Sequence, residues 1–173
     1  HRADDRTMRQ HPSAPLALAG LLVAIALALP SDASASHYRI TPGFELVTEA
    51  ERKALKAAGV QTTAQLLKST AKKAARRAFA KKTRLSLKRL KALAQQCDLL
   101  RVKGLGPSAV RLLQAAKLRD AKALKGANAP TLHKRLLALK STLSLPQVVP
   151  AEAELKSWIA QAKGLKTILE GIR

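Results

Sequence analysis

The sequence has a single cysteine, Cys97, among its 173 residues. One cysteine excludes an internal disulfide framework and any zinc knuckle built from several thiolates. The four histidines are scattered, and none lies at metal-ligand spacing from another candidate ligand. Cys97 falls on the predicted apolar face of Leu87, Leu90, Leu93 and Ala94. We therefore expect a buried thiol and no metal site.

Aromatic residues and catalytic motifs are equally scarce. The chain has one Trp, one Tyr and two Phe, too few for the base-stacking platforms on which many single-strand binders rely. No Ser/His/Asp or Cys/His arrangement, paired-carboxylate motif, phosphate loop or dinucleotide fingerprint occurs. We expect a protein that is not an enzyme and has no cofactor and no small-molecule substrate.

Acidic residues are rare beyond the N-terminal part of the chain. Residues 1–36 hold three Arg and three Asp, so the formal net charge of +21 belongs to residues 37–173, as 29 basic minus 8 acidic residues. Such an excess favours a polyanionic partner: nucleic acid, an anionic membrane surface or an acidic protein. The alternative is that the charge only keeps a Lys-rich surface soluble.

One long apolar run precedes the basic part. Residues 14–30 carry no charge and end at Pro30, a length at the lower limit for crossing about 30 Å of hydrocarbon. Their large aliphatic residues are Leu16, Leu21, Leu22, Ile25, Leu27 and Leu29. Ala33 and Ala35 follow with the A-x-A spacing that signal peptidases accept. The run is therefore either a signal peptide cleaved near Ala35 or an uncleaved membrane helix, and both interpretations stay open.

These features divide the chain into four parts. They are an N-terminal flank (1–13), a signal-like or transmembrane helix (14–30), a linker with the candidate cleavage region (31–40) and a basic domain (41–173). Beyond residue 45 the periodicity is helical almost throughout, with no convincing alternating strand. The sequence therefore predicts an all-α domain.

A candidate docking face lies in the first half of this domain. One predicted helix has an apolar stripe of Ala71, Ala74, Ala75, Ala78 and Phe79. Its other side carries Lys72, Lys73, Arg76, Arg77, Lys81 and Lys82. An amphipathic helix of this kind buries the apolar stripe and exposes the cations, so we expect these six residues to dock on an acidic surface.

A faint internal repeat relates two stretches at an offset of 58. Residues 55–66 align with residues 113–124. Each stretch is predicted to contain a helix end, a short turn with Thr62 or Asp120 as N-cap, and a new helix. Two related helical units would then pack as one domain.

The sharpest local motif is a glycine hairpin within residues 100–113. A helix is expected to end near Asp98 and another to start near Pro107, with Gly104 and Gly106 in the turn between them. The pattern resembles the helix-hairpin-helix motif, in which backbone N–H groups point at a phosphate beside a positive helix N-terminus. Leu105 would fill the space between the helices. The candidate phosphate-binding residues are Lys103, Gly104, Gly106, Ser108 and Arg111. The alternative is a hairpin that serves only to pack two helices.

Residues 41–165 as a whole resemble the domain-of-unknown-function 4332 family. The resemblance is carried by residues 55–67, 98–107 and 149–163. It implies a compact all-α fold of two helix-hairpin-helix-like units, with no enzyme activity and no cofactor. The chain departs from the family at residues 41–49, where acids and a Phe replace the expected Gly-x-Gly turn. Glu45 and its neighbours would repel a phosphate there, so at most one intact hairpin is expected.

Two function classes compete. In the first, the protein is a non-enzymatic accessory subunit of a thylakoid or inner-mitochondrial type of membrane complex, with other subunits or anionic lipid as partners. In the second, it is an exported or membrane-tethered DNA-binding protein that uses the Gly104–Gly106 hairpin for sequence-independent phosphate contacts. We expect the domain on the translocated side of a membrane (thylakoid lumen, intermembrane space or periplasm), or exported in soluble form after cleavage near Ala35.

Overall fold

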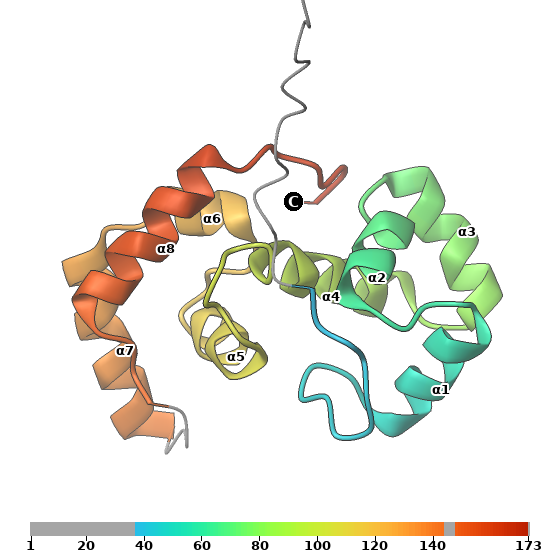
Figure 1. The fold of residues 1–173 in the computed structure, drawn as a ribbon, viewed down its shortest axis with the longest axis horizontal. Coiled ribbons are helices and arrows are strands. Elements are labelled where there is room, and N and C mark those ends of the chain that lie inside the picture. Colours follow the sequence, from blue (N-terminus) through green and yellow to red (C-terminus); the bar gives the residue numbers. More distant parts are fainter. Residues whose placement is uncertain (1–36, 144–147, 173) are drawn as a thin grey trace, which may run out of the picture. The chain divides into compact units, whose positions relative to one another are not determined.

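The computed structural model describes residues 37–143 and 148–172, and this part is all-α (Figure 1). Its helices are α1 (Glu49–Ala57), α2 (Thr63–Thr70), α3 (Lys73–Thr83), α4 (Leu87–Leu99), α5 (Pro107–Ala115), α6 (Ala121–Lys125), α7 (Ala129–Leu143) and α8 (Glu152–Gly164). The described residues form no strand, only an isolated β-bridge between Arg39 and Thr62. The predicted fold class is confirmed for this part of the chain.

The predicted membrane segment (14–30), with its flank and most of the linker, lies outside the described residues. Among the helices α1–α8, none combines the length and apolarity that a bilayer span requires.

Helix starts follow the capping residues in the sequence. Thr48 and Thr62 each accept a hydrogen bond from the backbone N–H three residues on, and Glu51 and Gln65 complete the two capping boxes. Asp120 caps α6 in the same way. These side chains satisfy N–H groups that a helix cannot satisfy internally, which fixes where the helices begin.

The two stretches of the predicted repeat end their first helices with matching turn hydrogen bonds. Val60 N–H donates to the carbonyl of Leu55 (2.9 Å), and Leu118 N–H donates to that of Leu113 (3.0 Å). Each bond closes the C-terminus of a nine-residue helix, α1 or α5. The residue before each donor has a positive φ, 84° at Gly59 and 65° at Lys117. The turn chemistry thus recurs although a lysine replaces the glycine.

The repeat also extends upstream of the predicted stretch. Val47 N–H donates to Phe44 O in the turn before α1, and Leu105 N–H donates to Val102 O in the turn before α5, both at 3.2 Å. We call α1–α4 the first repeat and α5–α8 the second. In the first, α2 and α3 pack on α4, and in the second, α6 and α7 pack on α8.

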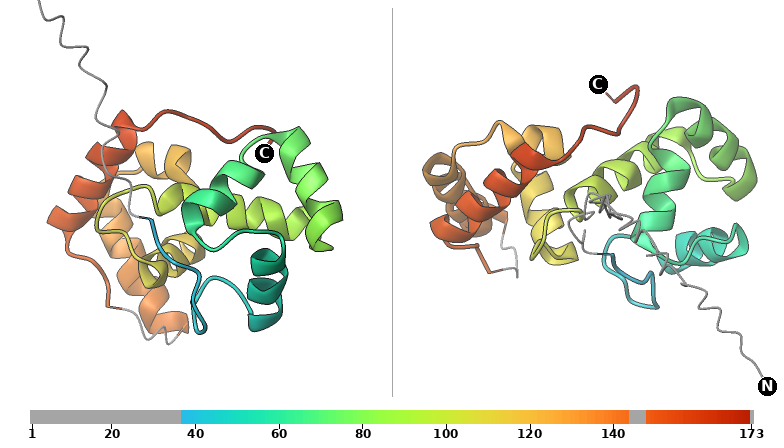
Figure 2. Two further views of the ribbon diagram at one scale, coloured as in Figure 1. Left: turned by 45° about the vertical axis from the view of Figure 1, so that its right-hand side comes forward. Right: turned by 45° about the horizontal axis from the view of Figure 1, so that its top comes forward.

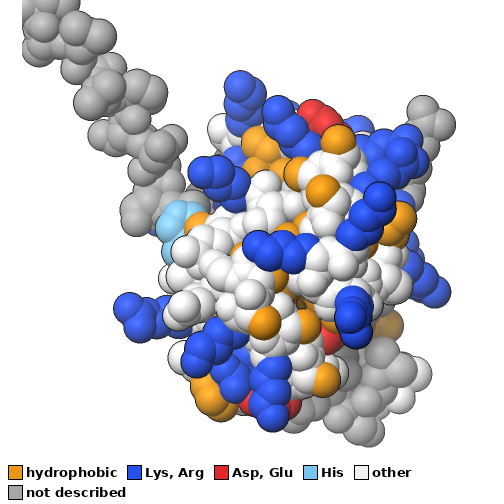
Figure 3. All heavy atoms as spheres, turned by 90° about the vertical axis from the view of Figure 1, so that its right-hand side faces the viewer, with side chains coloured by type: hydrophobic (Ala, Val, Ile, Leu, Met, Phe, Trp, Pro, Cys, Tyr) orange, Lys and Arg blue, Asp and Glu red, His pale blue; other side chains and the backbone are white. Residues whose placement is uncertain are grey.

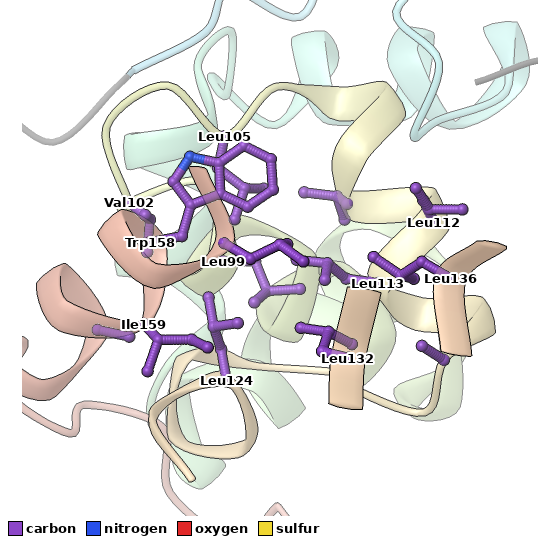
Figure 4. Close-up of a cluster of buried hydrophobic side chains, with 14 of the residues drawn as sticks. Leu99, Val102, Leu105, Leu112, Leu113, Leu124, Leu132, Leu136, Trp158 and Ile159 are labelled. Atoms are coloured by element: carbon purple, nitrogen blue, oxygen red, sulfur yellow. The ribbon is translucent and has the colours of Figure 1, made fainter. Parts of the chain in front are cut away.

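Each repeat has its own buried cluster. The cluster of the second repeat is shown in Figure 4 and takes in the end of α4 and the turn that follows it, with Leu99, Val102 and Leu105 packed among residues of α5–α8 such as Trp158. Leu105 is fully buried, as the hairpin pattern predicts. The first repeat buries residues of α1–α4, including Leu55, Leu66 and Leu90.

Residues 165–172 connect the two clusters. Figure 2 shows this C-terminal segment running from α8 towards α3. Leu165 packs against the cluster of the second repeat, whereas Ile168 and Leu169 pack against that of the first. Glu170 N–H donates to Ala71 O at 2.9 Å. The segment therefore follows the second repeat in sequence but packs against the core of the first.

Cys97 is buried in the cluster of the first repeat, as expected. Loss of solvation on burial, with a smaller contribution from Asp98, raises the pKa of its thiol to about 12. The thiol is therefore protonated at neutral pH and unsuited to nucleophilic or redox chemistry.

Candidate functional site

Five of the six residues of the predicted docking face are exposed. They are Lys72, Lys73, Arg77, Lys81 and Lys82. Lys73, Arg77 and Lys81 lie four residues apart on α3, so they share one stripe of the helix. Lys72 is the N-cap residue, and Lys82 donates from Nζ to Ala58 O at 3.0 Å. We call the exposed stripe of Lys73, Arg77 and Lys81 the α3 stripe.

The sixth residue, Arg76, is buried, so its predicted place on the docking face is wrong. The buried side of α3 consists of Arg76, Phe79 and Thr83, while Ala74 and Ala78, predicted to be inside, are exposed. Apolar side chains alone did not decide which side of this helix faces inward.

Arg76 is buried because three backbone carbonyls need its donors. Its guanidinium donates to Thr70 O (2.5 Å), Ala71 O (3.2 Å) and Glu170 O (2.6 Å). The first two carbonyls lie at the end of α2, where a helix leaves its acceptors without internal partners. Burial lowers the pKa of the Arg76 guanidinium, an effect that the nearby Glu170 carboxylate opposes. Arg76 therefore has a structural role.

Cations outnumber acids on the surface around the α3 stripe, where Glu170 is the nearby acid. No Asp or Glu occurs in the sequence between Arg52 and Cys97. Among the described residues, every ion pair uses a cation outside residues 72–88. Figure 3, which faces the α1–α3 side of the molecule, shows Lys and Arg side chains spread over this surface with few acidic ones. These charges are available to an external anion.

The glycine hairpin has the predicted boundaries. The helix before it ends at Leu99, the helix after it starts at Pro107, and Gly106 is the N-cap residue. Gly104 has φ 80°, a conformation that side chains with a Cβ rarely adopt. The backbone conformation of the turn therefore favours a glycine at position 104.

The hairpin backbone is already engaged by α8. Lys103 N–H donates to Gln161 Oε1 at 2.9 Å, and Gln161 Nε2 donates back to Lys103 O at 3.3 Å. A Cβ placed on Gly104 would lie 3.5 Å from Trp158 Nε1. The side chain of Lys103 is exposed, but its N–H is not free for a phosphate.

A carboxylate also occupies the start of α5. Ser108 donates from its hydroxyl to Glu45 Oε1 at 2.7 Å, and Arg111 Nη1 lies 3.7 Å from Glu45 Oε2. The structure thus brings together the predicted Ser108 and Arg111, with Gly104 and Gly106 lining the same open cavity. The Glu45 carboxylate, from the turn before α1, also lines this cavity. Sequence analysis predicted that Glu45 would repel a phosphate in its own turn and missed its contact with the second repeat.

Neither Glu45 nor Gln161 carries a motif that would have identified its role. Their partners lie 63 and 58 residues away in the sequence. The sequence offered one indication of these roles, since the repeat offset aligns Glu45 with Lys103 in equivalent turns. In the described part of the chain, no cluster of three His, Cys, Asp or Glu residues could hold a metal ion.

Comparison with known proteins gives one result. A sequence model described as a domain of unknown function (DUF4332) matches residues 45–165, a range that contains α1–α8. No curated protein and no solved structure matches the chain.

Proposed function

The chain belongs to the DUF4332 family, and from this premise we propose that it is a non-enzymatic accessory subunit of a membrane protein complex, docked by its basic helical domain on an acidic protein or lipid surface. The observation that carries the proposal is the α3 stripe. Three exposed cations on one side of a helix, in a stretch without Asp or Glu, form a surface complementary to an anionic partner.

The internal contacts of the hairpin support docking over DNA binding. A DNA phosphate at the start of α5 would have to displace the Glu45 carboxylate from Ser108 and Arg111. It would also find Lys103 N–H bonded to Gln161. These contacts support a packing role for the turn, and we propose that the exposed cations of the first repeat bind the anionic partner.

The left-handed turn at Gly104 favours the second candidate, a DNA-binding protein that is exported or tethered to a membrane. The conformation of Gly104 and the position of Pro107 fit a hairpin that offers N–H groups to phosphates. This candidate predicts affinity for duplex DNA that falls steeply with salt, because bound counterions are released.

The membrane part of the proposal rests on the uncharged run of residues 14–30. As an uncleaved helix it would hold the domain at the membrane, and as a signal it would deliver the domain across one. In both cases we propose a place on the translocated side, in a thylakoid lumen, an intermembrane space or a periplasm.

The test is the native size and intact mass of the chain extracted in mild detergent from its own membranes. We expect the wild-type chain to migrate in a large defined assembly. A triple charge reversal of the α3 stripe (Lys73→Glu, Arg77→Glu, Lys81→Glu) should release it. The matched control reverses three exposed lysines outside the α3 stripe (Lys117→Glu, Lys134→Glu, Lys163→Glu) and should leave the assembly intact.

Two outcomes contradict the proposal. A wild-type chain found only as a free monomer has no complex to dock on. An assembly that both triple variants disrupt equally would show that net charge, and not the α3 stripe, holds it. Binding of duplex DNA that is lost when Gly104 and Gly106 are replaced by bulky residues would favour the second candidate.

A further inference from the structure

A groove that the sequence did not predict lies between the N-terminal segment, α1 and α2. It has a volume of about 410 Å³. Its lining includes the side chains of Arg39, Arg52, Lys56, Thr62 and Gln65. Among the described residues, no Asp or Glu lines it, whereas three cations from two separate segments do. This is the composition of an anion site.

Backbone pairing fixes Arg39 at the rim. Ile40 N–H donates to Gln61 O (2.8 Å), and Thr63 N–H donates to Tyr38 O (2.9 Å), so residues 38–40 run extended beside the start of α2. Successive side chains of an extended segment point to opposite sides. Ile40 is buried and Tyr38 is half-buried, which leaves Arg39 exposed towards the groove.

The two cations of α1 lie one turn apart on the helix. Arg52 forms a bidentate ion pair with Glu49, donating from Nε at 2.7 Å and from Nη2 at 2.5 Å, and its side chain is only 17% exposed, so only its remaining N–H groups can serve an external anion. Lys56 follows four residues later and is exposed. A guanidinium that is already oriented loses little rotamer freedom when it binds an anion.

The capping box of α2 uses the acceptor atoms of Gln65 and Thr62. Gln65 Oε1 accepts from Gln61 N–H (2.8 Å) and from Thr62 N–H (3.2 Å), and Thr62 Oγ1 accepts from Gln65 N–H (3.2 Å). The polar hydrogens that remain on these two side chains are the Gln65 amide and the Thr62 hydroxyl. Both therefore add donors to a groove that already has three cations.

The second repeat shows that the fold does not require these cations. The positions of α5 equivalent to Arg52 and Lys56 are Val110 and Gln114, as the shared turn hydrogen bonds establish. The same helix thus packs without charge there. Packing of the helix therefore does not explain the presence of Arg52 and Lys56 at these positions of α1.

We propose that this groove binds a phosphate group, either as a free ion or as part of a phosphorylated side chain. A tetrahedral dianion offers only acceptors, which matches the guanidinium, ammonium, amide and hydroxyl donors that converge on the groove. The site is separate from the α3 stripe and from the glycine hairpin, so it stands whether or not the proposed function is correct.

The experiment titrates the ¹⁵N-labelled full chain with inorganic phosphate and, separately, with O-phosphoserine at low chloride, and follows the backbone amides of residues 39–42 and 60–65. We expect saturable shifts at these amides, with a dissociation constant on the order of 1 mM or below. Binding of either titrant supports the proposal, and the tighter one identifies the source of the phosphate.

Three variants locate the site. Arg39→Gln with Lys56→Gln should weaken binding at least about tenfold, since two charge-assisted contacts are lost. Gln65→Glu keeps the capping box, in which Glu is a preferred residue, and places a carboxylate in the groove, so it should abolish binding without unfolding α2. The matched control, Arg119→Gln with Lys134→Gln, removes two exposed charges outside the groove and the α3 stripe and should bind within about twofold of the wild type.

The proposal is overturned if the wild type shows no saturable shift at these amides. It is also overturned if Gln65→Glu binds phosphate as tightly as the control double variant, because the ion would then be attracted by the net charge of the whole surface.

Discussion

The burial of Arg76 predicts a stability effect that its exposed neighbour does not share. Replacing Arg76 with Met keeps an apolar stem of similar length and removes all the donors that reach Thr70 O, Ala71 O and Glu170 O. Hydrogen bonds from charged donors contribute about 1.5–3 kcal/mol each, and removing a buried partner leaves the desolvation of its acceptors uncompensated.

The net effect is smaller than the sum of three such bonds. Arg76 is itself desolvated, which is why burial lowers the pKa of its guanidinium, and the Met variant does not incur that penalty. Ala71 O also keeps the hydrogen bond from Glu170 N–H. We therefore expect Arg76→Met to lower the free energy of unfolding by about 3 kcal/mol.

Urea unfolding of the full chain, followed by circular dichroism, measures this value. Arg77→Met is the matched control, since it removes the same charge from an exposed position of α3 and should change the stability by less than about 0.5 kcal/mol. Limited trypsin digestion adds a local measurement. Loss of the bond to Glu170 O should speed cleavage after Lys166 in the Arg76 variant only. Equal stability of the two variants, or equal cleavage, would refute the structural role of Arg76.

Two further predictions concern the turns and the buried acid. Lys117 holds a φ of 65° at the position where the first repeat has Gly59. Lys117→Gly should therefore raise the free energy of unfolding by about 0.5–1 kcal/mol, and Gly59→Ala should lower it by about 1 kcal/mol. Urea unfolding midpoints measure both effects, and changes of the same sign would contradict the shared turn conformation. Asp98 is 5% exposed, and burial raises the pKa of its carboxyl above the usual 3.8 against the opposing bonds from Arg101 and Ala121 N–H. The folded state therefore binds this proton more tightly than the unfolded state, so the contribution of Asp98 to stability is full below pH 3.8 and is lost as the pH rises through the folded-state pKa. Because the Asn side chain cannot ionise, the stability of Asp98→Asn relative to the wild type should rise as the pH rises from 3.8 through the folded-state pKa. Urea unfolding at a series of pH values measures this difference in stability. A difference that stays constant with pH would mean that burial does not perturb the pKa of Asp98.

Helix-capping and turn residues made much of the fold predictable. Thr62 and Asp120 act as caps, Pro107 starts a helix and Gly104 lies in the turn before it, all as expected from residues within one turn of each site. The buried face of α8, with Leu155 and Trp158, also follows the helical period. Such features depend on steric contacts and hydrogen bonds between residues close in the sequence, so they can be predicted from the sequence.

The errors arise where distant segments meet. The helical period of α3 favours an alanine stripe as the inner face, because alanine is apolar. The actual inner face is decided by the open carbonyls at the end of α2 and by Glu170, which lies 94 residues from Arg76 in the sequence. Hydrogen bonds to these carbonyls offset the cost of burying Arg76, and no local sequence pattern contains that balance.

The long-range contacts at the hairpin and at the groove could not be predicted for the same reason. Glu45 reaches Ser108 across the two repeats, and Arg39 joins Lys56 at one groove only because residues 38–40 pair with the start of α2. In both cases the sequence supplied the charges, and long-range backbone pairing decided which of them meet.

The two repeats depend on each other through these long-range contacts. The second repeat supplies Ile168 and Leu169 to the core of the first, and the turn before α1 supplies Leu46 to the core of the second. Each exchange buries apolar surface that one repeat alone would leave in water, at roughly 25 cal/mol per Å². Arg76 and Glu45 add a polar contact in each direction. The two repeats therefore complete each other's buried clusters, while the α3 stripe belongs to the first repeat and Gly104 and Gly106 precede the second.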